Sequence, residues 1–121
     1  MKMTKALQMI LRIAGVIQLV LGIIVWTGSA DNLVPIHILL GAVITLALFL
    51  LAYQALRAGV ARWLVALAGV WAIGLPVWGM LQQSIFPEAY EWIAQVLHLL
   101  CGIGALGLAE MLAPRIRAKQ P

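Results

Sequence analysis

The sequence predicts an all-α integral membrane protein, a four-helix bundle whose chain crosses the bilayer up, down, up and down. Of its 121 residues, 64% are hydrophobic and 10% are charged, and the mean hydropathy is +1.06. Soluble domains contain about 45–50% apolar and about 25% charged residues. The composition therefore excludes a disordered chain, a coiled coil and a cytosolic enzyme core, and the length fits one domain, residues 1–121.

The few charged residues are spaced as they would be at the ends of membrane-crossing helices. Four stretches between charges contain 18, 25, 25 and 18 uncharged residues, and a helix needs about 20 mainly apolar residues to cross the hydrocarbon. The strands of a membrane barrel would instead alternate polar and apolar residues. We therefore expect helical spans at about residues 6–26, 33–56, 63–81 and 90–112.

Turn-forming residues separate these spans. Gly28 and Asp31 interrupt the chain after the first span, and Pro35 suits the first turn of the second. Gly59 follows the second span, and Pro87 separates the third from the fourth. Each connection is short, so consecutive spans are expected to be antiparallel neighbours.

The first span has some features of a secretory signal peptide. Lys2 and Lys5 precede the apolar run, and residues 28–30 resemble a cleavage site. However, the run is longer than the about 7–15 residues of a signal peptide, and Arg12 interrupts its start. We expect an uncleaved first helix.

The basic residues predict the orientation. All eight Lys and Arg fall on one side of the expected topology, whereas Asp31, Glu88 and Glu91 fall on the other. Cytoplasmic loops are enriched in Lys and Arg. The pattern therefore predicts a multi-pass protein of a bacterial inner membrane, with both termini cytoplasmic and the lipid bilayer as its partner. The net charge of +4 reflects this topology rather than nucleic-acid binding, and at most it helps to hold anionic lipid.

The chain contains two histidines, in similar sequence contexts on the second and fourth spans. His37 and Gly41 form one H-x-x-x-G phrase, and His98 and Gly102 form another. Because these two spans run in the same direction, the repeat predicts two helical hairpins related by an axis along the membrane normal. Both histidines would then lie in the outer half of the bundle. Ionisable groups at membrane depth are costly and usually mark a site.

Imidazoles from two facing helices fit the two axial positions of a haem iron. Gly41 and Gly102 lie one turn deeper than His37 and His98 on the same helix faces, where a flat ring could lie against the backbone. Two observations weigh against this interpretation. The depths of the histidines in their helices match only approximately, and the outer half contains no Lys or Arg to meet the haem propionates.

The alternatives for the histidines are a structural role, another metal or a proton-linked function. A zinc site is disfavoured because no third or fourth ligand of the right type lies near both histidines on the outer side. The single cysteine, Cys101, excludes an internal disulfide and the C-x-x-C-H attachment of a c-type haem. We expect Cys101 to be a packing residue.

Gly15, Gln18 and Gly22 form one stripe along the first span, where small residues allow close helix approach. Gln18 is a candidate hydrogen-bond donor to an imidazole, a haem propionate or a quinone carbonyl. The alternative is that both glycines are packing notches and that Gln18 forms an interhelical hydrogen bond. Arg12 and Glu110 lie near the same membrane boundary and are expected to form a structural pair.

Gln18, the H-x-x-x-G phrase of His37, Gln82 or Gln83, and His98 together resemble a group of small bacterial four-helix membrane proteins of largely unknown function. The same pattern is similar, more distantly, to four-helix membrane b-type cytochromes, including the superoxide–quinone oxidoreductase type. That resemblance implies bis-histidine haem b, with His37 and His98 as the ligands. Two haems would need four histidines, so this chain would hold one haem b.

These observations favour a mono-haem b-type membrane cytochrome that carries single electrons at the outer side of the membrane. Its partner would be a quinone, a periplasmic protein or an oxygen species. One alternative is a cofactor-free accessory or assembly subunit of a membrane complex. A small dimeric transporter is less favoured, because proton-coupled exporters generally need a membrane-embedded carboxylate. A homodimer or a place in a larger complex fits any of these functions.

Overall fold

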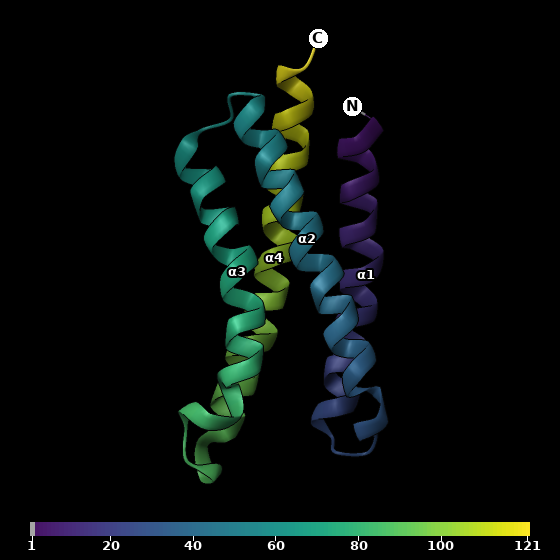
Figure 1. Ribbon diagram of the computed structural model, residues 1–121, viewed down its shortest axis with the longest axis vertical. Helices are drawn as coiled ribbons and strands as arrows, with labels where there is room; N and C mark the ends of the chain where they lie inside the picture. The colour runs from purple at the N-terminus through teal and green to yellow at the C-terminus, as the bar shows by residue number, and fades with distance from the viewer. Residues whose placement is uncertain (1) are drawn as a thin grey trace.

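The computed structural model describes residues 2–121 and consists of four long helices. They are α1 (Lys2–Trp26), α2 (Val34–Arg57), α3 (Arg62–Ile85) and α4 (Glu91–Lys119). Two short 3-10 helices, η1 (Asp31–Leu33) and η2 (Glu88–Tyr90), precede α2 and α4. The helices run alternately down and up, and both termini lie at the same end of the bundle (Figure 1). The predicted all-α four-helix bundle is confirmed.

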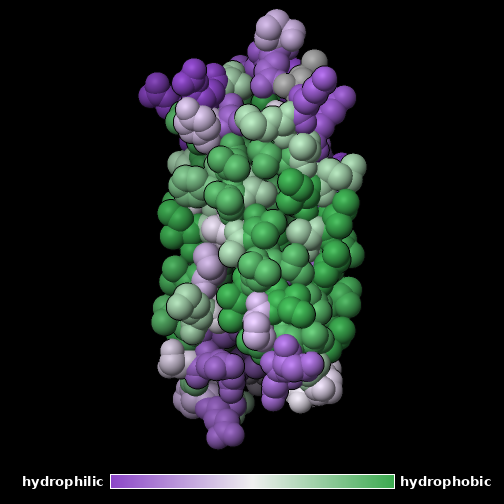
Figure 2. Space-filling model, turned by 45° about the vertical axis from the view of Figure 1, so that its right-hand side comes forward, coloured by the Kyte–Doolittle hydropathy of each residue, from purple (hydrophilic) through white to green (hydrophobic). Residues whose placement is uncertain are grey.

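All four helices are long and apolar enough to cross a membrane. Figure 2 shows a broad apolar belt between two hydrophilic ends. The helices extend beyond the predicted spans: α1 begins at Lys2 rather than residue 6, α3 ends at Ile85 rather than residue 81, and α4 ends at Lys119 rather than residue 112. The predicted limits followed hydropathy, whereas Lys, Arg and Gln are good helix formers that continue a helix into polar surroundings.

Two glycines end helices in the left-handed conformation that side chains disfavour. Gly28 has φ 73° after α1, and Gly59 has φ 72° after α2. At the second site, the Val60 N–H donates to the Ala55 carbonyl (2.9 Å) and the Gly59 N–H donates to the Leu56 carbonyl (3.1 Å). These two bonds form a Schellman motif, which reverses the chain from α2 into α3 within four residues.

The buried core lies in one half of the bundle. We call residues 2–15, 44–72 and 105–119 the packed half, and residues 16–43 and 73–104 the histidine half. The packed half contains the largest fully buried apolar side chains: Leu11, Leu48, Leu51, Leu64, Leu112 and Ile116. In the histidine half, Ala94 is the one buried residue. In Figure 1 the α1–α2 and α3–α4 hairpins lie together near the termini and diverge towards the other end.

Candidate functional site

The two imidazoles meet in the histidine half. The ring centroids of His37 on α2 and His98 on α4 are 6.3 Å apart, and their planes are inclined by 64°. Both side chains are half-buried. The structure thus brings together the two residues on which the interpretation of the sequence depends.

The hairpins are offset in a way that brings the two histidines to one level. His37 lies three residues after the start of α2, and His98 lies seven residues after the start of α4. This difference of four residues corresponds to about 6 Å along a helix. In Figure 1 the loop of the α3–α4 hairpin extends slightly further from the termini than the loop of the α1–α2 hairpin. The offset accounts for the depth mismatch noted in the sequence.

His37 is positioned by α1, its partner in the first hairpin. Gln18 donates from Nε2 to the backbone carbonyl of His37 at 2.7 Å, so it forms the interhelical hydrogen bond that the sequence offered as an alternative. A Cβ atom on Gly22 would lie 3.2 Å from Cε1 of His37, and one on Gly41 would lie 3.1 Å from Nε2 of Gln18. Both glycines therefore make room for the polar groups that meet between α1 and α2.

His98 is positioned by α3, its partner in the second hairpin, in a similar manner. A Cβ atom on Gly79 would lie 2.8 Å from Cε1 of His98, a distance that real Cβ contacts do not reach. The neighbouring Trp78 donates its indole N–H to the backbone carbonyl of Ala94 at 3.0 Å. Since Ala94 precedes His98 by one helical turn, this bond fixes α4 next to the histidine.

A second tryptophan fixes α4 on the other side of His98. Trp71 donates its indole N–H to the backbone carbonyl of Cys101 at 2.8 Å. A Cβ atom on Gly104 would lie 2.6 Å from the Trp71 ring, so this glycine provides the space that the indole occupies. The two tryptophans are thus packing and hydrogen-bonding residues of the α3–α4 pair.

The other predicted site residues lie further from the rings. Gly15 faces the side chain of Leu106 and serves as a packing notch for α4. A Cβ atom on Gly102 would lie 3.6 Å from Leu19, an ordinary packing contact. Gly41 and Gly102 thus face side chains, Gln18 and Leu19 respectively. The expected pair of Arg12 and Glu110 is present, although it lies in the packed half.

The sequence interpretation missed Gly79 and the helix-fixing role of Trp78. The sequence position of these glycines could have indicated their role, because the glycine that faces each imidazole lies near the end of the preceding helix. Gly22 precedes His37 by 15 residues, and Gly79 precedes His98 by 19. The difference is one helical turn, so an alignment of the two phrases by their histidines does not superimpose the glycines.

Four buried polar atoms of the histidine half have no hydrogen-bond partner within residues 2–121. They are Nδ1 of His37, Nδ1 of His98, Oε1 of Gln18 and Oε1 of Gln82, one from each helix. A buried polar atom without a partner costs about 1–3 kcal/mol, and such atoms in native proteins call for an ion, a ligand or an ordered water. The histidine half therefore has the polar capacity for a bound group.

The two rings form an edge-to-face pair, and their centroid separation of 6.3 Å lies within the range of about 4.5–7 Å that is usual for aromatic contacts. The same separation is compatible with two imidazoles that share one ion, because metal–nitrogen bonds of about 2.0–2.1 Å place the ring centres roughly 5–6.5 Å apart. Cε1 of His37 lies next to Gly22, and Cε1 of His98 lies next to Gly79. Among the described residues, no group of three or more His, Cys, Asp or Glu could hold a metal, so protein side chains alone do not form a closed structural zinc site.

Comparisons of this chain with protein-family models, with curated proteins and with solved structures find no match.

Proposed function

We propose that this protein is a mono-haem b-type membrane cytochrome in which His37 and His98 ligate a single haem iron. The observation that carries the proposal is the 6.3 Å separation of the two rings. Two further features support it: the unpartnered Nδ1 atom of each imidazole and the scarcity of buried side chains in this half. The α1–α2 and α3–α4 hairpins diverge in this half of the bundle (Figure 1), and a flat, mostly apolar macrocycle would have to lie between them.

Each residue of the site has a defined task. His37 and His98 would hold the haem iron through imidazole nitrogens, while Gln18 and Trp78 hold the backbone of α2 and α4 next to them. Gly22 leaves space for the imidazole of His37, and Gly79 leaves space for that of His98. When bound, haem b supplies a one-electron redox couple, and two protein ligands favour electron transfer over oxygen binding.

The histidine half offers no cationic side chain to the propionates of haem, since it contains no Lys or Arg and its loop end carries Asp31, Glu88 and Glu91. Neutral hydrogen-bond donors of this half would therefore have to hold them. Gln82 is the best placed in the sequence, because it lies near the end of α3 and its amide has an unpartnered buried oxygen. Rotation of that amide presents its N–H₂ group instead.

The location of the site suggests where electrons are exchanged. The basic residues gather at the end that holds both termini, and such residues favour the cytoplasmic side. We therefore propose that both termini are cytoplasmic, as expected for a multi-pass protein of a bacterial inner membrane. The haem would then exchange electrons near the outer surface with a quinone, a periplasmic protein or an oxygen species.

Optical spectroscopy tests the proposal directly. The full-length chain, expressed with sufficient haem and purified in detergent, is expected to show a Soret band, reduced-minus-oxidised α and β bands, and one haem per chain. His37→Ala and His98→Ala should each lose the low-spin bis-histidine signature. Gln83→Ala, which removes an exposed polar side chain from the same half, should keep it. A well-folded chain without a Soret band would overturn the proposal and would favour the cofactor-free accessory subunit.

A further inference from the structure

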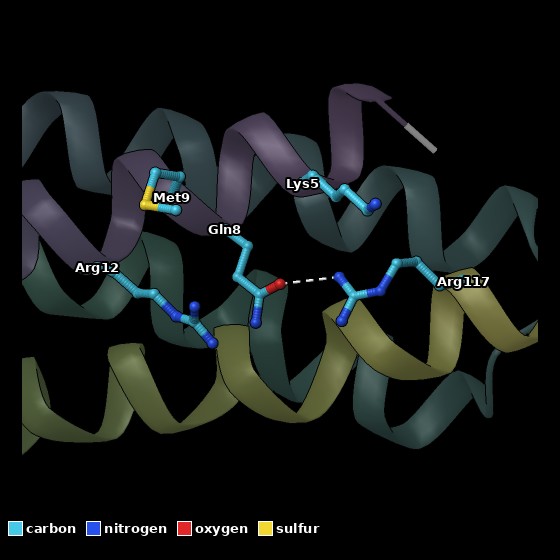
Figure 3. A pocket seen from close by; sticks show the side chains of 5 residues that line it. All are labelled: Lys5, Gln8, Met9, Arg12 and Arg117. Atoms are coloured by element: carbon cyan, nitrogen blue, oxygen red, sulfur yellow. Dashed lines mark hydrogen bonds between the residues drawn. The ribbon is translucent and has the colours of Figure 1, made fainter.

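A cationic cavity lies between α1 and α4. It belongs to the packed half, whereas the two histidines belong to the other half of the bundle. It has a volume of about 300 Å³ and is lined by Lys5, Gln8, Met9 and Arg12 of α1 and by Arg117 of α4. In Figure 3 the side chains of Arg12 and Arg117 approach the Gln8 amide from its two sides, and the ammonium group of Lys5 lies towards Arg117.

The polar groups around the cavity are held in place by one another. Arg12 makes a two-bond ion pair with Glu110, at 2.6 Å from Nε and 2.8 Å from the terminal nitrogen. Gln8 donates to the same carboxylate and accepts from Arg117, both at 2.8 Å. The network orients the guanidinium groups before any ligand arrives, which lowers the entropic cost of binding.

The charges of this network do not cancel. Three cationic side chains, from Lys5, Arg12 and Arg117, line the cavity. One carboxylate, from Glu110, pairs with Arg12, which leaves two positive charges. Arg117 bonds to a neutral amide, and within residues 2–121 Lys5 has neither an ion pair nor a side-chain hydrogen bond. Arg and Lys around a cavity are the side chains that bind phosphate oxygens in proteins.

We propose that this cavity binds the phosphate headgroup of an anionic membrane lipid. Besides the charge, the observation that favours a lipid over a soluble phosphate is an exposed apolar stripe on α1. Met9 lines the cavity, and Ile13, Val16 and Val20 continue the same helix face towards the middle of the apolar belt, each at least half exposed. A headgroup in the cavity would place its acyl chains along this stripe.

The test compares lipids and matched variants of the full-length protein in detergent. The shift of the thermal unfolding midpoint is titrated with dioleoyl phosphatidylglycerol, with dioleoyl phosphatidylcholine and with inorganic phosphate. The variants are Lys5→Gln and Arg117→Gln. Arg62→Gln and Arg115→Gln are controls, because they remove the same charge from exposed positions outside the cavity.

Phosphatidylglycerol is expected to stabilise the wild-type protein more than phosphatidylcholine does. Each cavity variant should weaken its apparent affinity about fivefold, and the two controls should not. Lys5 is exposed, so Lys5→Gln decides the test even if Arg117→Gln unfolds. Equal affinities in all five proteins would overturn the proposal, as would an equal shift with inorganic phosphate, which would indicate a soluble anion. The haem spectrum should be unchanged in every variant, which separates this test from that of the proposed function.

Discussion

The two halves of this bundle differ in packing and in polar chemistry. The packed half holds almost every buried side chain, and many of its helix contacts are made by alanines such as Ala68, Ala72 and Ala105. Four of its polar side chains form a network between α1 and α4, although Thr45 and Gln54 each keep one buried polar atom without a partner. The histidine half has one buried residue, Ala94, and contains two unpartnered imidazole nitrogens.

This contrast suggests that one half of the bundle stabilises the fold and that the other half binds a ligand. Helix association in a membrane is driven by close packing and interhelical hydrogen bonds rather than by the hydrophobic effect. The packed half therefore supplies most of the stability of the bundle. The histidine half contributes few buried side chains, and under the haem proposal a bound group would add contacts there. Binding regions in proteins are commonly drawn from such less stable parts.

The strongest test of the contrast is the same substitution in both halves of α2. Leu48 is fully buried, and Leu39 is 65% exposed. Leu48→Ala should leave a cavity and lower the free energy of unfolding by about 2–5 kcal/mol. Leu39→Ala removes contacts that are mainly with lipid or detergent, so its loss should be much smaller. Both variants are measured by denaturing-detergent titration with far-UV circular dichroism as the signal. Similar losses for the two variants would show that stability is not concentrated in the packed half.

The fold followed from the sequence because its determinants are local. Twenty apolar residues between charges are sufficient to predict a spanning helix, since backbone groups in lipid must be satisfied within the segment. The pairing of Arg12 with Glu110 was equally accessible, because both lie near one membrane boundary on the first and last helices. Charge and hydropathy therefore predicted the topology.

The detail of the candidate site was less accessible, because it depends on helix rotation and axial offset. Gly41 and Gly102 were expected to border a flat ring, and the structure places them against Gln18 and Leu19. The tilt and rotation of a helix are set by its packing against neighbouring helices. They cannot be predicted from the spacing of residues within one helix. For the same reason, Gly79 could not be assigned to His98 before the two hairpins were placed.

A smaller effect, on haem affinity, is expected from substitution of the glycine that contacts the His98 ring. A methyl group on Gly79 would meet the His98 ring, whereas one on Gly74 has no neighbour within 4 Å. Such overpacking costs about 1–3 kcal/mol, which corresponds to roughly 5- to 150-fold in cofactor affinity. Gly79→Ala should therefore retain less haem than Gly74→Ala when both are titrated with haem and followed by the Soret band.

Gly22→Ala sharpens this prediction, because its methyl group would lie 3.2 Å from the His37 ring rather than the 2.8 Å found at Gly79. We expect an intermediate loss of haem. Equal haem affinity in all three glycine variants would mean that the imidazoles are not held in the positions described, and the haem proposal would lose its geometric support.

The smallest expected effect concerns the link between α3 and α4. Trp78→Phe keeps an aromatic ring and removes the indole donor to the Ala94 carbonyl. Interhelical hydrogen bonds in membrane proteins contribute about 0.6 kcal/mol on average. The denaturing-detergent titration used for Leu48→Ala should therefore show a loss of this size in the free energy of unfolding. Trp92→Phe is the matched control, since Trp92 is exposed and makes no side-chain hydrogen bond within residues 2–121. An equal loss in both variants would mean that this bond does not hold α4 beside His98. The position of α4 would then depend on other contacts with α3, such as the hydrogen bond from Trp71 to the Cys101 carbonyl.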